Sequence, residues 1–144
     1  KRVVKLEIIT NNPKLVDWLE EKQLDLQFKF IKGTVKEVVI ESRKEIINGM
    51  VLVTDPLAGR RVRTTPYLSI ILKPGMGQIH PEQILRVEEL LDIYYKNIEY
   101  LQGLGDNQHL DYQILDQSLV ASALDKGMIN NTTRRKFNEQ YETR

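Results

Sequence analysis

Cysteine is absent from the 144 residues, and its absence excludes several kinds of chemistry. Without a thiol the chain has no disulfide, no thiolate metal site and no cysteine nucleophile. The glycine-rich fingerprints of dinucleotide sites and P-loops are also missing, as is the G-x-S-x-G elbow of serine hydrolases. The two histidines, His80 and His109, have no second ligand at a metal spacing, so we predict no protein-made metal site and no cofactor.

Long apolar runs and an excess of one charge are lacking as well. No run approaches the roughly 18 residues of a membrane-spanning helix, and the first residues alternate like a strand rather than a signal peptide. The 21 basic side chains nearly balance the 20 acidic ones, so no global field attracts nucleic acid or an anionic membrane. We therefore expect a cytoplasmic protein with neither partner, in which any anion is bound by a local site.

The composition is that of an ordinary globular protein, with 41% hydrophobic and 28% charged residues. Its length favours a single domain, residues 1–144, with a core that needs no disulfide or metal. We expect residues 1–73 to form an α/β portion, residues 81–127 a helical hairpin, and residues 132–144 a short helix or a tail.

The α/β portion is predicted from alternating strand-like and helix-like segments. Residues 3–10 and 24–31 have strand patterns, the second with period two as near a sheet edge. Asn12 followed by Pro13 is typical of a helix start, which predicts a helix over 13–23. Thr34 and Glu37 have the spacing of a capping box, which opens a second helix.

The second helix should run over residues 35–48, with Gly49 as its left-handed end. Residues 50–53 are apolar throughout, as in a strand covered on both faces, and residues 67–72 predict a fourth strand of undetermined direction. The order predicts a small Rossmann-like βαβαβ(β) sheet of the α/β class, in two or three layers.

Two further helices are predicted over residues 81–101 and 109–126, packed together as a helical hairpin at the C-terminal end of the fold. The first has a narrow apolar seam that includes Leu91, Tyr94 and Ile98. This seam either packs inside the molecule or forms an interface with a partner. The two readings carry equal weight at this point.

Two of the strand-like runs end on small polar residues and a proline. The run LEIITNNP ends with Thr10, Asn11 and Asn12, and MVLVTDP ends with Thr54 and Asp55. In α/β proteins ligands collect at the carboxyl ends of parallel strands, so both ends are candidate ligand sites. The alternative is structural: Asn12 caps its helix, Asn11 serves the turn, and Asp55 belongs to an Asp-Pro turn.

A basic segment follows Asp55. Arg60 and Arg61 could bind an anionic ligand, because the guanidinium fork binds two oxygens at once, and Thr65 and Tyr67 add hydroxyl groups. The alternative is an ordinary solvated loop.

The motifs at 9–13 (ITNNP), 54–59 (TDPLAG) and 65–69 (TPYLS) resemble the GrdX-like proteins, which are encoded beside components of glycine, sarcosine or betaine reductase. The resemblance covers roughly the first half of the chain. It implies a cytoplasmic accessory protein of unestablished activity, and it carries no catalytic residue onto this sequence.

Three hypotheses follow, in order of preference. The first is an accessory protein that holds a polar or anionic small molecule at the strand ends. The second is an interaction protein whose long helices form a homodimer or dock a larger enzyme. The third is an enzyme with Asp55 as acid or base, ranked last because no second catalytic group is visible.

Overall fold

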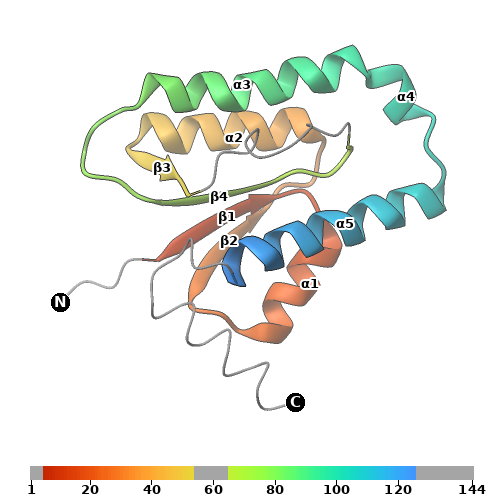
Figure 1. Ribbon diagram of the computed structural model, residues 1–144, viewed down its shortest axis with the longest axis horizontal. Coiled ribbons are helices and arrows are strands. Elements are labelled where there is room, and N and C mark those ends of the chain that lie inside the picture. The colour runs from red at the N-terminus through yellow and green to blue at the C-terminus, as the bar shows by residue number, and fades with distance from the viewer. Residues whose placement is uncertain (1–4, 54–64, 126–144) are drawn as a thin grey trace.

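The computed structural model describes residues 5–53 and 65–125. The elements in chain order are β1 (Leu6–Thr10), α1 (Pro13–Lys22), β2 (Leu26–Phe30), α2 (Val35–Ile47), β3 (Met50–Leu52), β4 (Ser69–Pro74), α3 (Pro81–Lys96), α4 (Ile98–Gln102) and α5 (Asp106–Asp125). Figure 1 shows three layers, with α2 and α3 on one side of the sheet and α1 and α5 on the other. The predicted α/β class is confirmed. None of the described helices is both long and apolar enough to cross a membrane.

The sheet has the order β2-β1-β4-β3. β1 and β2 are parallel, and β4 is antiparallel to both of its neighbours, β1 and β3. Two reversals restore the direction, so β3 runs the same way as β1. The carboxyl ends of β1, β2 and β3 therefore point to the same edge of the sheet, although β4 separates the first from the third. β2 lies at an edge of the sheet, as its period-two pattern predicted.

β3 differs from the expected strand covered on both faces. It is a short edge strand whose residues are only half-buried, because β4 and not β3 occupies the central position beside β1. Its apolar pattern has another cause: Val53 packs against the core on one face of the sheet, and Met50 and Leu52 pack against the core on the other. The Leu52 N–H is satisfied by Gln83 Oε1 of α3 at 2.8 Å, which protects part of this edge.

The predicted helical hairpin is wrong. α3 packs against α2, and α5 packs against α1, so the two long helices lie on opposite faces of the sheet. The physical reason is that the two faces of the sheet each need an apolar cover, and each long helix covers one of them. Val87 and Leu90 of α3 join the core beneath α2, while Val120 and Leu124 of α5 join the core beside α1.

The local signals near the helix ends are confirmed. Thr34 and Glu37 form the capping box of α2. Gly49 has a φ of 106°, as a left-handed helix end requires. A Cβ on Gly75, at the end of the β3–β4 pairing, would lie 2.2 Å from the Gly49 carbonyl oxygen, so this close approach needs glycine.

Candidate functional site: a polar cluster at the strand ends

The carboxyl end of β1 carries buried polar residues, Thr10, Asn11 and Asn12. Ser69, the first residue of β4, lies opposite Thr10 in the sheet register, and their hydroxyl oxygens are 2.7 Å apart. Thr10 Oγ1 also accepts the Asn12 backbone N–H at 3.0 Å. The side chains of Thr10 and Ser69 thus begin a polar network on the face of the sheet that α5 covers (Figure 1).

Asn12 links two helices through its side chain. Its Oδ1 accepts the Lys14 N–H at 3.0 Å and so caps α1. Its Nδ2 donates to the Gln113 carbonyl oxygen and to Asp116 Oδ2, both at 2.9 Å. The capping alternative is therefore confirmed, and both amide protons hold α5 against the end of β1.

The Asn11 side chain forms hydrogen bonds with two other segments, the one that follows β2 and the one that leads into β4. Its Nδ2 donates to the carbonyl oxygens of Gly33 and Pro66, each at 3.1 Å, and its Oδ1 accepts the Leu68 N–H at 2.9 Å. These partners are far from Asn11 in the sequence, so the side chain has a structural role that extends beyond its own turn. Since both amide protons are used within the protein, a ligand that takes one of them has to displace an existing bond.

Asp116 of α5 completes the network. Its Oδ2 accepts hydrogen bonds from Ser69 Oγ at 2.6 Å and from Asn12 Nδ2. Burial raises the pKa of Asp116 from 3.8 to about 6, although these two hydrogen bonds act to lower it. We call Thr10, Asn12, Ser69 and Asp116 the strand-end cluster.

Sequence reasoning missed Asp116, His109 and Gln113. These three residues are spaced by four and three along α5, and the core residues Val120 and Leu124 follow on the same stripe at two further steps of four. The stripe that faces the protein is therefore polar in its first half and apolar in its second. This spacing was a usable signal, but it was obscured because α5 carries apolar side chains on every side, including the exposed Leu110 and Ile114.

Tyr67 lies beside the strand-end cluster, in the segment that leads into β4. Its hydroxyl oxygen is 3.0 Å from His109 Nδ1 and accepts a hydrogen bond from Gln113 Nε2 at 2.9 Å. The Tyr67 and His109 rings meet edge to face, with centroids 5.7 Å apart. Thr65 Oγ1 accepts the Tyr67 N–H at 3.1 Å and shapes the turn.

The other predicted site residues, Thr54, Asp55, Arg60 and Arg61, lie outside the described residues, as does the predicted C-terminal helix or tail at 132–144. Their ligand roles stay predictions. Among residues 5–53 and 65–125, no group of histidine and carboxylate side chains is placed to hold a metal ion.

The interface candidates fall mainly inside the molecule. Leu91 and Tyr94 pack against the core between α2, α3 and the sheet, and Ile98 begins α4 with a half-buried side chain. The role of these three residues at an interface is untested.

The comparison with known proteins supports the motif resemblance. No curated protein and no solved structure matches the chain significantly. The family described as "GrdX-like protein" matches residues 7–125, a span that extends beyond the first-half motifs and takes in α5 with His109, Gln113 and Asp116. Because this span is most of the chain, the protein belongs to the GrdX-like family.

Proposed function

We propose that this protein is a small accessory protein that binds a polar or anionic small molecule at the carboxyl edge of its sheet. The observation that supports this proposal is the strand-end cluster, together with Tyr67 and His109 beside it. Its metabolic setting is the one that the GrdX resemblance implies, namely the amino-acid reductases.

The position and composition of the cluster both favour a ligand. Polar side chains in a protein interior cost stability, and they are kept where they serve a site or fix a unique arrangement. Here they gather where strands of an α/β sheet end, the usual place for ligands. Asp55, Arg60 and Arg61 lie in residues 54–64, which follow β3 in the sequence and precede the segment that leads into β4.

Binding is favoured over catalysis because Asp116, the acidic residue of the strand-end cluster, is already hydrogen-bonded within the protein. Asp116 accepts from Ser69 and Asn12, and no imidazole lies between Ser69 and Asp116 to activate the serine hydroxyl. Asp55 as an acid or base stays the third hypothesis, as in the sequence-based ranking.

A thermal-shift screen tests the proposal. Inorganic phosphate, nucleotides, acyl phosphates and amino acids are each added to the purified protein and the melting temperature is measured. A ligand at 100 times its Kd stabilises the folded state by about 2.7 kcal/mol, which gives a rise of several degrees. We expect at least one of these classes to give such a rise, and no rise across the whole panel would contradict the proposal.

A matched pair of variants locates the response. Removing two positive charges in Arg60→Ala/Arg61→Ala should reduce the rise produced by an anionic ligand. Arg86→Ala, on α3 and paired with Glu89, should leave it unchanged. If both variants reduce the rise in melting temperature equally, the response is a nonspecific charge effect and does not indicate a site at the strand ends.

A second candidate function is an interaction module, which the surface of the last two helices favours. Leu110, Ile114 and Leu119 of α5 are exposed, as is Tyr100 of α4. A helix with apolar residues on every side often contacts a second partner. Ile114→Lys should then change the mass measured by light scattering, or abolish capture of a reductase component, while the melting temperature stays unchanged.

A further inference from the structure

Tyr67, Gln113 and His109 form a hydrogen-bonded chain whose direction follows from donor counting. The Gln113 amide nitrogen only donates, so the Tyr67 oxygen accepts that bond. The Tyr67 proton is then available for His109 Nδ1, 3.0 Å away. In the reverse arrangement Nδ1–H donates to Tyr67, and the Tyr67 proton, which no described residue accepts, has to be taken up by solvent.

This direction determines the tautomer of neutral His109. With Nδ1 as the acceptor, the ring proton is on Nε2. The Nε2–H has no hydrogen-bond partner in residues 5–53 and 65–125, and the side chain is half-buried rather than fully in solvent. Tyr67 and Gln113 therefore hold a histidine in place and leave one donor unused.

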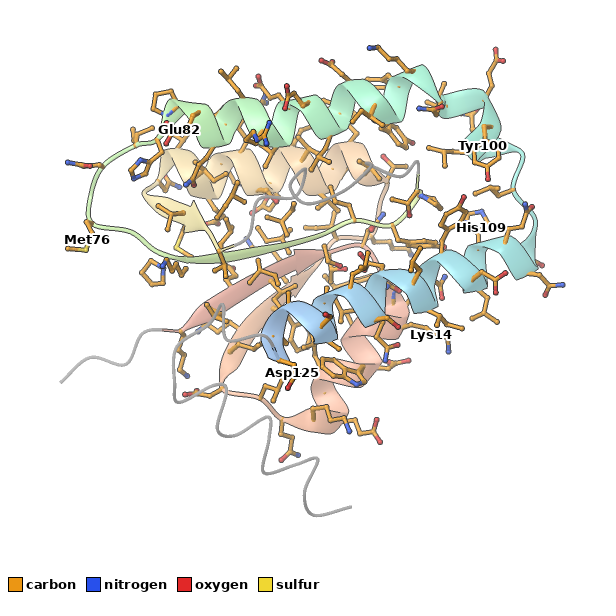
Figure 2. The ribbon with its side chains drawn as sticks, viewed as in Figure 1. Lys14, Met76, Glu82, Tyr100, His109 and Asp125 are labelled. Carbon is orange, nitrogen blue, oxygen red and sulfur yellow. The ribbon has the colours of Figure 1, made fainter. Side chains whose placement is uncertain are left out.

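The position of His109 favours an anionic acceptor. The residue lies in the first turns of α5, where its backbone N–H bonds to the Gly105 carbonyl oxygen. The positive end of a helix dipole attracts negative charge. Figure 2 shows His109 at the end of α5 that is next to α4, on the same end of the molecule as Tyr100.

We propose that His109 donates its Nε2–H to an anionic oxygen of the bound molecule, a carboxylate or a phosphate, and that Tyr67 and Gln113 orient the ring for this bond. The inference rests on the proposed function and specifies the ligand chemistry of the same edge. It adds His109 and Gln113 to the residues that the sequence indicated.

The experiment uses the fact that the chain has only two histidines. In protein labelled with nitrogen-15 in histidine, long-range proton–nitrogen correlation spectra report the tautomer of each ring. His80, whose Nδ1 lies 3.5 Å from Glu82 at the start of α3, is the internal control. Inorganic phosphate and acetate are titrated separately, and the thermal-shift panel is run in parallel.

We expect free His109 to have its proton on Nε2, and its resonances to shift saturably with phosphate, acetate or both, while those of His80 stay in place. If only one of the two anions shifts the His109 resonances saturably, the oxygen that His109 binds belongs to that class, phosphate or carboxylate. Tyr67→Phe should alter the tautomer and weaken binding about tenfold, the effect of one lost hydrogen bond. His109→Gln, which keeps a donor, should bind more tightly than His109→Leu.

The outcomes separate the inference from the proposed function. If a compound raises the melting temperature but the His109 resonances do not move with any anion, the inference is wrong and the proposed function stands. If neither the melting temperature nor the resonances respond, both are wrong. A free His109 with its proton on Nδ1 also overturns the inference.

Discussion

Ser69 Oγ donates a hydrogen bond to Asp116 Oδ2 over 2.6 Å and so joins the first residue of β4 to the middle of α5. The same carboxylate oxygen accepts from Asn12, the N-cap of α1. One oxygen atom therefore connects the end of β1, the start of β4 and α5. This connection places the polar half of α5 over the strand ends, where we propose the ligand binds.

The raised pKa of Asp116 predicts a specific pH dependence of stability. The pKa is about 6 in the folded protein and 3.8 as its ordinary value, so between these pH values the folded state binds more protons than the unfolded state. The free energy of unfolding should therefore fall as the pH rises from about 4 to 6, by about 3 kcal/mol from this group. Urea unfolding at a series of pH values measures this fall in the free energy of unfolding.

The control for this prediction is Asp116→Asn, which keeps an oxygen acceptor but cannot titrate. The difference between wild type and variant isolates Asp116 from other groups, such as Glu37 and Glu41, whose pKa values are lowered. A difference that is constant with pH, or that grows in favour of wild type as the pH rises, would contradict the buried position of Asp116.

Asn12→Ala should destabilise the protein more than loss of a cap alone. A helix cap contributes about 1 kcal/mol, and the variant also removes two hydrogen bonds to α5, one of them to the Asp116 carboxylate. We expect a total loss of about 2–3 kcal/mol in chemical denaturation. Thr34→Ala, at the exposed capping box of α2, is the matched control and should cost about 1 kcal/mol. Equal losses would show that the bonds to α5 contribute nothing.

The local structure was predictable because its signals are local. The Thr34 capping box, the Asn12 cap and the left-handed Gly49 each depend on neighbours within a turn, and all are present. The position of β4 between β1 and β3 is not local. It depends on which strands bury Ile70, Ile71 and Leu72 best, and an apolar run reveals burial without revealing direction or order.

The same distinction between local and long-range signals explains which residues of the candidate site could be predicted from the sequence. Thr10 and Asn12 were identifiable because strand ends before a proline have a sequence signature. Asp116 was not, since its partners Ser69 and Asn12 are far away in the sequence and only the packing of α5 on the α1 side brings them together. The hairpin prediction failed for a related reason: apolar stripes on two consecutive helices fit one another as well as they fit opposite faces of a sheet.

Leu91→Lys tests whether the α3 seam is core. Leu91 packs against the core beneath α2, so a charge there should lower the free energy of unfolding by about 2 kcal/mol or more. Leu85→Lys, on the same helix with 62% of its surface exposed, should change it by less than about 0.5 kcal/mol. If Leu91→Lys keeps full stability and instead changes the oligomeric state, Leu91 belongs to an interface.

Gly75→Ala tests the close approach at the end of the β3–β4 pairing. The added Cβ would lie 2.2 Å from the Gly49 carbonyl oxygen, so the backbone has to shift. Overpacking of this kind costs about 1–3 kcal/mol, seen as a lower melting temperature. Gly103→Ala, whose Cβ has no neighbour nearer than 3.6 Å, should show a much smaller effect. A neutral Gly75→Ala would mean that the strand end is not held against Gly49.

The central claim is that a small polar or anionic molecule binds at the carboxyl edge of the sheet. The most direct test is a crystal structure of the protein with the compound that raises its melting temperature most. We predict density for that compound at the strand ends, in contact with the side of α5 that carries His109 and with the segment around Tyr67. A compound bound on another surface, with Tyr67 and His109 untouched, would contradict the account.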